Sequence, residues 1–274
     1  MVEFVDDGGY ERKWYATNLV GLSARDLAST AFNADPVPLH IAATRETHRG
    51  LFVLLEQTTE LAEAAAVFAH YMSVAFELRK TASDSDAEAK AYRSSYVKLL
   101  QGWGFDSNNP QGAVLKGWVE SRFGITPTFH AAPLEEFPSA AWLRYLEEKL
   151  GSRFHNNCIL MQLDALYEYC QWSIQRFRAM GPRHVTLYRG AHRCEESFLE
   201  GSLRERSGVV RLNNLVSFSA SRERAEEFGD LVFEAEVPCV KVLFYPGMLE
   251  SRVLNGEGEA LVVGGDYRVK VSYV

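Results

Sequence analysis

The segment Ser251–Val274, SRVLNGEGEALVVGGDYRVKVSYV, joins a glycine-containing turn to two runs of alternating residues that are typical of β-strands. Glu257 and Glu259 lie two positions apart, and residues i and i+2 of an extended chain point to the same side. We therefore expect both carboxylates to face one site, with Gly258 allowing backbone or ligand to come close. Paired carboxylates suit glycosyl transfer, in which one stabilises a cationic sugar and the other handles a proton. A GEGE turn is more often a solvated loop tip, so the rest of the chain must decide.

The chain from Gly181-Pro182 onward is rich in further strand patterns. Val, Phe and Tyr recur there with a period of two and are separated by short turns. One short helix is expected among these strands, capped by Ser221 and ended by Gly229. The expected strands cover residues 184–190, 212–221, 231–238, 240–246, 259–265 and 267–274.

The chain before residue 180 carries mainly helical patterns. Apolar residues recur there at spacings of three and four, which is typical of amphipathic helices. Residues 19–33 are expected to be partly helical, and two prolines favour an extended conformation over 34–41. The expected helices are 58–80, one that starts within 81–90 and runs through 100, 110–124, 139–150 and 157–177.

This order of elements, with helices first and strands later, predicts an α+β fold and not a doubly wound parallel sheet. We expect a mostly helical N-terminal lobe over residues 1–180, packed on a strand-rich core over residues 181–274. The chain of 274 residues, 47% of them hydrophobic, is expected to form one compact unit overall.

Composition and missing motifs exclude several classes of function. The net charge is −7 and no basic stripe is present, so nucleic acid is not expected as a partner. No apolar run reaches membrane-spanning length and no export signal is visible, which indicates a cytoplasmic protein. The cysteines form no CxxC pair and are expected to be free thiols; they are Cys158, Cys170, Cys194 and Cys239. GxGxxG, P-loop, GxSxG and HExxH motifs are absent, the histidines are scattered, and no metal site is expected.

Two polar segments in the strand-rich part join the glutamate pair as candidates. Tyr188-Arg189-Gly190 ends one strand, and an arginine there can pair with phosphate beside a glycine that lets a ring approach. Ser217-Phe218-Ser219 ends another, with both hydroxyls on one face, where they can position a carboxylate or a ribose. Each segment alone also fits an ordinary polar strand end.

Together, and in this order, the three segments resemble the Arg–Ser–Glu signature of arginine-modifying mono-ADP-ribosyltransferases. The run Ser217–Gly229, SFSASRERAEEFG, is similar to that family's Ser-x-Ser strand with its following helix and Phe-Gly. Phe218 stands where the family usually has threonine, at a position expected to point away from the site. The resemblance implies a core of two packed β-sheets around an NAD cleft.

The resemblance extends upstream to nearly the whole chain. The segments 16–29, 102–125 and 154–172 resemble the NAD⁺–dinitrogenase-reductase ADP-ribosyltransferases of nitrogen-fixing bacteria. That family attaches ADP-ribose from NAD⁺ to one arginine of the nitrogenase iron protein and so switches nitrogenase off reversibly. The resemblance implies NAD⁺ as substrate, the iron protein as target and a PII-type nitrogen signalling protein as regulator.

The family pattern also implies roles for the acidic and hydroxyl residues. Glu259 is expected to stabilise the oxocarbenium-like ribose, and Ser217 to orient Glu259. Glu257 is expected to align the acceptor guanidinium and take its proton, since Glu-x-Glu accompanies arginine acceptors.

The remaining expected site residues bind the dinucleotide. Arg189 would clamp the phosphates, Gly190 would offer backbone hydrogen bonds to the nicotinamide amide, and Phe228 would stack on the nicotinamide ring. Ser219 is a further candidate for contact with NAD⁺. The helical part carries no catalytic signal of its own, and we expect it to cover one side of the cleft and to help recognise the target or the regulator.

Two other kinds of function stay open from the sequence. One is an NAD⁺ glycohydrolase, or an arginine ADP-ribosyltransferase with another protein target. The other is a non-enzymatic NAD-binding regulatory module, which the retention of all four signature residues disfavours.

Overall fold

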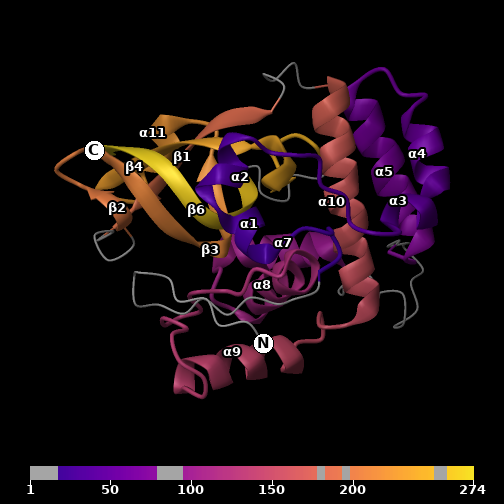
Figure 1. Ribbon diagram of the computed structural model, residues 1–274. Coiled ribbons are helices and arrows are strands. Elements are labelled where there is room, and N and C mark those ends of the chain that lie inside the picture. The colour runs from indigo at the N-terminus through magenta and orange to yellow at the C-terminus, as the bar shows by residue number, and fades with distance from the viewer. Residues whose placement is uncertain (1–17, 79–94, 178–182, 193–197, 250–257) are drawn as a thin grey trace.

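A computed structural model describes residues 18–78, 95–177, 183–192, 198–249 and 258–274 (Figure 1). Helices occupy most of the described chain before residue 178. They are α1 (Ala24–Ala28), α2 (Thr30–Ala34), α3 (Thr44–Thr47), α4 (Arg49–Leu55), α5 (Leu61–Ala75), α7 (Tyr96–Phe105), α8 (Pro110–Phe123), α9 (Ala140–Gly151) and α10 (Asn157–Phe177).

The described chain after residue 182 consists mainly of strands. They are β1 (His184–Ala191), β2 (Phe198–Ser202), β3 (Ser207–Ser219), β4 (Leu231–Pro238), β5 (Val242–Phe244) and β6 (Glu259–Tyr273). A short helix, α11 (Arg222–Glu226), follows β3, and a 3₁₀ turn, η2 (Cys239–Lys241), precedes β5. Helices first and strands later confirm the α+β expectation.

All six described strands belong to one hydrogen-bonded sheet with the order β2-β3-β1-β4-β6-β5. Each described pairing is antiparallel, and β3 also pairs with β6. This additional pairing closes β3, β1, β4 and β6 into a ring. The two separate sheets that the resemblance implied are therefore not seen among the described strands, because the long β3–β6 ribbon connects them.

The last strand differs from the sequence prediction, which gave two strands over 259–265 and 267–274. β6 is continuous from Glu259 to Tyr273. A bend at a glycine pair makes this possible: Gly265 has a φ of +127°, and a Cβ on Gly264 would lie 1.6 Å from the carbonyl oxygen of Asn213. The opposite strand, β3, has its irregularity at the same place, between Leu212 and Leu215. The glycines bend the ribbon without ending it.

Three further features of the sheet differ from the prediction. The strand expected over 240–246 is short, since β5 covers only Val242–Phe244 and the 3₁₀ turn η2 occupies Cys239–Lys241. β2 was missed because FLEGS is short and scarcely alternates, and Gly201 within it has a φ of +74°. β3 begins at Ser207, earlier than the predicted 212, and its first half pairs with both β2 and β6.

The predicted helices over 110–124, 139–150 and 157–177 are present and differ by at most one residue at each end. The helix predicted over 58–80 is shorter than expected, because α5 begins at Leu61 and ends at Ala75. Asn109 caps α8 and Gly124 ends it with a φ of +74°, as a C-terminal glycine commonly does. α7 starts at Tyr96 behind the cap Ser95 and continues to Phe105, beyond the predicted end. The predicted start of that helix within 81–90 lies outside the described residues.

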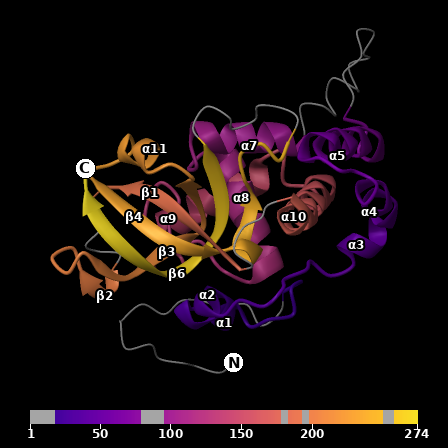
Figure 2. The same cartoon turned by 90° about the horizontal axis from the view of Figure 1, so that it is seen from above.

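The helices cover both faces of the sheet. In Figures 1 and 2, α1 and α2 lie on one side of β6 and β3, whereas α7 and α8 lie on the other. α10 packs against β5, and α3, α4 and α5 lie beyond α10, away from the sheet. One hydrophobic core runs through these layers; among its fully buried members are Phe68 of α5, Leu166 of α10, Phe244 of β5 and Val262 of β6.

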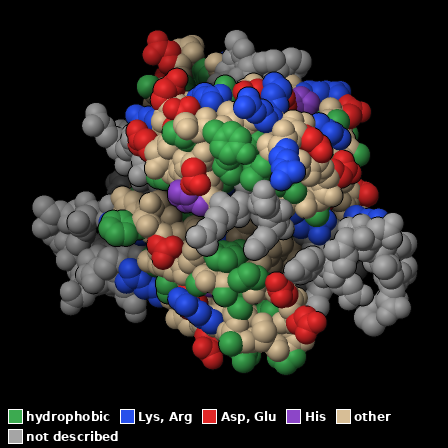
Figure 3. Space-filling view, turned by 90° about the vertical axis from the view of Figure 1, so that its left-hand side faces the viewer, with side chains coloured by type: hydrophobic (Ala, Val, Ile, Leu, Met, Phe, Trp, Pro, Cys, Tyr) green, Lys and Arg blue, Asp and Glu red, His purple; other side chains and the backbone are tan. Residues whose placement is uncertain are grey.

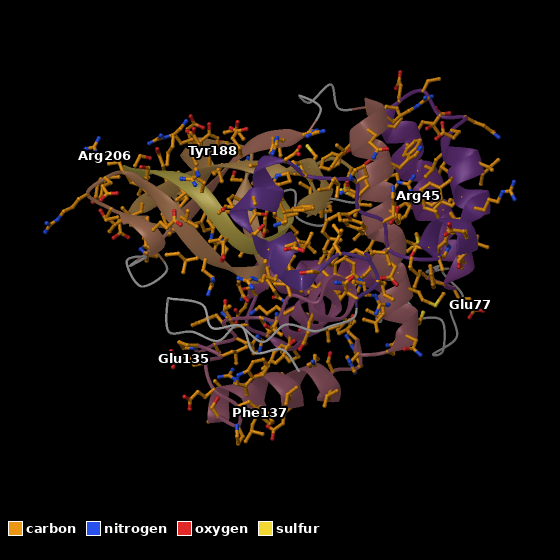
Figure 4. All side chains as sticks on the ribbon, viewed as in Figure 1. Arg45, Glu77, Glu135, Phe137, Tyr188 and Arg206 are labelled. Atoms are coloured by element: carbon orange, nitrogen blue, oxygen red, sulfur yellow. The ribbon has the colours of Figure 1, made fainter. Side chains whose placement is uncertain are left out.

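Buried polar side chains tie the helices to each other and to the sheet. Glu168 of α10 has no exposed surface, and its carboxylate accepts hydrogen bonds from the Ile41 amide at 2.7 Å and from Arg45 Nε at 2.6 Å. Figure 4 labels Arg45 beside α10. Asn214 of β3, also fully buried, donates to the carbonyls of Lys116 and Ile125 at 2.8 and 2.9 Å. Such groups are stable in a core only when they are paired.

Within the described residues, no helix is long and apolar enough to cross a membrane. Within the described residues, Cys158, Cys170 and Cys239 form no disulfide, and Cys194 lies outside these residues. On the face shown in Figure 3, acidic and basic side chains are interspersed and no single basic patch stands out.

The bend in β6 leads to a stability prediction. We expect Gly264→Ala to destabilise the protein by about 3 kcal/mol or more, because the new methyl group meets the Asn213 carbonyl. Gly50→Ala is the matched control: its Cβ meets nothing within 4 Å, and alanine in a helix adds up to about 1 kcal/mol. Urea unfolding of both variants measures the difference. Equal stability of the two variants would contradict the assigned bend.

Candidate functional site

A cavity of about 300 Å³ lies where α7, α11 and the strands β1, β3 and β6 meet. This volume is at the lower end of the range for small-molecule sites. Its lining includes Trp103 to Ser107, Tyr188 to Gly190, Ser217 to Ser219, Ala225, Phe228 and Glu259. The cavity is therefore lined by residues from each of the three segments that the sequence analysis identified, namely Tyr188–Gly190, Ser217–Ser219 and the segment of Glu259.

The cavity brings together Arg189, Ser217 and Glu259, which lie up to 70 positions apart in the sequence. Arg189 Nη1 donates a hydrogen bond of 2.7 Å to the Ser217 carbonyl, and Ser217 Oγ donates to Glu259 Oε1. The strand register explains the second contact. Ser219 is directly opposite Glu259, so Ser217, two residues before it, lies diagonally across the same face.

Arg189 brings a positive charge to the same wall as Glu259. β1 and β3 pair at Tyr188 and Ser219, and the next residue, Arg189, reaches across to the β3 backbone. Burial lowers the pKa of the Arg189 guanidinium below its ordinary value, and the nearby Glu259 carboxylate opposes that change. Arginine keeps its charge under any ordinary condition, so the site contains a fixed cation beside a carboxylate.

Gly190 and Phe228 lie where α11 packs on β1. A Cβ at Gly190 would be 2.2 Å from the Ala225 carbonyl oxygen and 2.9 Å from Phe228 Cβ, so only glycine fits under this helix. Ser221 caps α11, as predicted, but the helix ends at Glu226, before the predicted Gly229. The turn that follows holds Phe228 at the cavity, with its side chain about half exposed. The predicted contacts of both residues with nicotinamide stay predictions.

The two residues that follow Ser217 have different surroundings. The Phe218 side chain is buried in the core, with its ring centroid 6.1 Å from that of Tyr267, in line with the expected orientation away from the site. Ser219 is also buried, and its Oγ accepts a hydrogen bond of 3.1 Å from the Ser221 amide at the start of α11. This hydroxyl therefore already supports the turn into the helix.

Glu257, the other half of the Glu-x-Glu pair, lies outside the described residues. The structure describes the chain again from Gly258, which has a φ of +64°, and Glu259 is the first residue of β6. Within the described residues, no group of His, Cys, Asp or Glu could hold a metal ion.

Trp103 of α7 is a site residue that the sequence analysis did not identify. Its indole Nε1 donates to Ser217 Oγ at 2.9 Å and to Glu259 Oε1 at 3.2 Å, and the side chain is 4% exposed. The segment GWGF that contains it was part of the resemblance. A tryptophan on a helix is nevertheless typical of core packing, so its pattern alone gave no sign of a role in the cavity.

A buried lysine lies behind Trp103. Lys116 of α8 is 1% exposed, and its Nζ is 5.9 Å from the centroid of the Trp103 ring. The ammonium donates to Asn108 Oδ1 at 3.2 Å and to the Phe129 carbonyl at 3.0 Å, and it lies 3.2 Å from His130 Nδ1. These contacts fix the loop that leads from the cavity wall into α8.

A larger cavity, of about 660 Å³, lies elsewhere on the sheet. It contains none of the predicted site residues. Its lining includes the acidic, basic and histidine residues His184, Glu200, Glu205, Glu234, Glu236, Arg268 and Lys270. We base the site on the smaller cavity because that is where the signature residues meet.

Lys116 gives a prediction on pH dependence. Burial lowers its pKa to about 8, against the smaller opposing effects of Asp106 and Glu148. Between pH 8 and the ordinary lysine pKa the unfolded chain therefore binds more protons than the folded protein, and stability rises with pH. We expect the free energy of unfolding of the wild type, relative to Lys116→Met, to rise by about 2 kcal/mol from about pH 7 to about pH 9.5. Urea unfolding at both pH values tests this, and a constant difference would contradict it.

Comparison with known proteins agrees with the geometry of the cavity. The family model described as dinitrogenase reductase ADP-ribosyltransferase matches residues 17–271. The chain is 47% identical over 264 residues to the NAD(+)–dinitrogen-reductase ADP-D-ribosyltransferase of Rhodospirillum rubrum, covering 95% of this chain and 96% of that protein. No solved structure matches the chain. The match over nearly all of its length shows that the chain belongs to the dinitrogenase reductase ADP-ribosyltransferase family.

Proposed function

We propose that this protein is a mono-ADP-ribosyltransferase that moves ADP-ribose from NAD⁺ to an arginine side chain of dinitrogenase reductase, the nitrogenase iron protein, and so inactivates nitrogenase reversibly. The observation that carries the proposal is the convergence of Arg189, Ser217 and Glu259 in one cavity. Family membership and the name of the Rhodospirillum rubrum relative support the choice of donor and target.

Glu259 acts on the donor. When the bond between nicotinamide and ribose C1′ breaks, its electron pair goes to the nicotinamide nitrogen and leaves an oxocarbenium-like ribose. The Glu259 carboxylate stabilises this cation and holds the ribose 2′-hydroxyl. Ser217 orients that carboxylate through the hydrogen bond to Oε1, so the group is in place before charge develops.

The neighbouring residues bind the rest of NAD⁺. Arg189 still has guanidinium donors beyond the one bonded to the Ser217 carbonyl, and they pair with the phosphates. Phe228, half exposed at the cavity, stacks on the nicotinamide ring, and the Gly190 backbone meets the nicotinamide amide. Ser219 lines the same wall, next to the ribose.

Glu257 acts on the acceptor. An arginine guanidinium has a pKa of about 13.8, so at neutral pH only about one molecule in 10⁶–10⁷ is a free base. The new bond from guanidine nitrogen to C1′ therefore requires a carboxylate that aligns the guanidinium and takes its proton. Glu257, two residues before Glu259, supplies it.

The partners beyond the target follow from the family resemblance. We propose a PII-type nitrogen signalling protein as regulator and the cytoplasm as the place of action. The helical part of the chain, residues 1–180, contributes to recognition of target or regulator. An NAD⁺ glycohydrolase, or a transferase for another protein, is the alternative that the same cavity would serve.

Incubation with labelled NAD⁺ tests the proposed reaction. We expect label on the iron protein, at one arginine, in a reaction run with and without MgADP. Peptide mapping identifies the residue, and a second, unrelated protein serves as the negative target. Release of free ADP-ribose without labelled protein would instead favour the glycohydrolase.

The division of work between the glutamates gives a second test. Glu257→Gln is expected to lower transfer to protein by about 10²-fold or more while NAD⁺ hydrolysis stays within about tenfold, because only the acceptor's base is lost. Glu259→Gln is expected to lower both by about 10²-fold or more, because the ribose cation loses its carboxylate. Glu147→Gln, an exposed position on α9, is the control that changes neither. Equal losses of transfer and hydrolysis in the Glu257 variant would count against this division.

A further inference from the structure

Trp103 of α7 donates its indole N–H both to the Glu259 carboxylate and to the Ser217 hydroxyl. We propose that Trp103 is a positioning residue for the transfer reaction: its indole N–H fixes the orientation of the Glu259 carboxylate from outside the sheet. The inference rests on the proposed function, because it assigns how the carboxylate of that same site is held.

The chemistry of the indole suits this task. Its N–H is a donor without any acceptor capacity and does not ionise, so it favours a carboxylate oxygen in one position at every working pH. Ser217 Oγ and Trp103 Nε1 both donate to Glu259 Oε1. Two donors on one oxygen restrict rotation of the carboxylate and thereby set the direction of its second oxygen. The distance of 2.9 Å from the indole to Ser217 Oγ also holds that hydroxyl, so the three groups form one network.

The surroundings of Trp103 keep the indole fixed. Asn109 Nδ2 donates to the carbonyl of Gly102 at 2.7 Å, which ties the end of α7 to the start of α8. A Cβ at Gly102 would lie 2.7 Å from the Gln111 side chain, so the two helices pack closely at this point. The buried Lys116 ammonium adds a cation–π contact to the Trp103 ring. A donor that its own surroundings hold in place can hold its acceptor in turn.

The position of the acceptor distinguishes Trp103 from similar tryptophans. Trp118 Nε1 donates to Asp164 at 2.7 Å, and Trp172 Nε1 donates to Glu56 at 2.7 Å. Neither of these carboxylates lines the cavity. Trp172 is 5% exposed and Trp103 is 4% exposed. Trp172 is therefore a matched control for removal of a buried indole–carboxylate hydrogen bond.

The kinetic test compares Trp103→Phe with Trp172→Phe in the full-length protein. Phenylalanine keeps an aromatic ring and removes the donor. We expect Trp103→Phe to lower kcat about 10- to 100-fold for both NAD⁺ hydrolysis and transfer, because the carboxylate serves both, while KM for NAD⁺ changes less than about threefold. Trp172→Phe is expected to keep kcat within about twofold. A raised KM with unchanged kcat would overturn the proposal, since Trp103 would then be only a wall of the NAD⁺ site.

A double variant tests whether Trp103 and Ser217 act through the same carboxylate. If they do, Trp103→Phe combined with Ser217→Ala loses less activity than the product of the two single losses predicts. Independent roles would give a loss equal to that product, and this result would contradict a shared action on Glu259. Circular dichroism and thermal unfolding of each variant show that the comparison is made on folded protein.

A spectroscopic test is independent of activity. The chain has 5 tryptophans, and the Trp103→Phe spectrum assigns the Trp103 indole N–H signal in ¹⁵N-labelled protein. We expect Glu259→Gln to move this signal and to leave that of Trp172 in place, because the charged acceptor is lost only at Trp103. An unmoved Trp103 signal would overturn the contact. If the wild type cleaves no NAD⁺ yet the signal moves, the proposed function fails and the hydrogen bond stands.

Discussion

The close packing of the Gly264 backbone against the Asn213 carbonyl determines where the site can form. Because no side chain separates them, the ribbon of β3 and β6 bends at this point and remains paired on both sides of the bend. The C-terminal part of β6 pairs with β4, and its N-terminal part pairs with β5. The next residue, Asn214, uses the same irregularity to donate to two carbonyls of the α8 region. The bend thus joins the sheet to α8, which packs on the helix of Trp103, and Ser217 and Glu259 lie at the end of the ribbon that lines the cavity.

The neighbours of Glu259 include both neutral hydrogen-bond donors and a cation. The indole and the Ser217 hydroxyl are neutral donors that contact its Oε1, and Arg189 is a nearby cation that donates a hydrogen bond to the Ser217 carbonyl. Neutral donors fix the direction of the carboxylate without adding a positive charge, so these two hydrogen bonds do not neutralise the charge that a developing ribose cation meets. The arrangement is therefore suited to orienting a carboxylate that must act on a positive charge.

The sequence predicted the parts of this structure that depend on local pattern and failed where distant contacts decide. Alternation found the strands of Arg189, Ser217 and Glu259, and the diagonal relation of the last two follows from strand geometry. The break predicted between residues 265 and 267, after the glycine pair, was wrong because glycine usually weakens a strand, whereas here the Asn213 carbonyl occupies the space that a side chain on Gly264 would need. Trp103 was missed because helical periodicity cannot distinguish an indole in the core from one whose N–H meets a residue 156 positions later.

Trp103 belongs to the helical part of the chain and Glu259 to the sheet, so a protein that binds the helices could affect the hydrogen bond between them. The carboxylate depends on a donor carried by α7, and α7 is fixed by Asn109 and by its packing on α8. A shift of α7 by about 1 Å is enough to break a hydrogen bond of 3.2 Å. A protein bound to the helices alters the chemistry only if it binds the two arrangements of α7 with different affinity, since equal affinity shifts no equilibrium. The hydrogen bond between the indole and the carboxylate is the point where such a difference would reach the ribose.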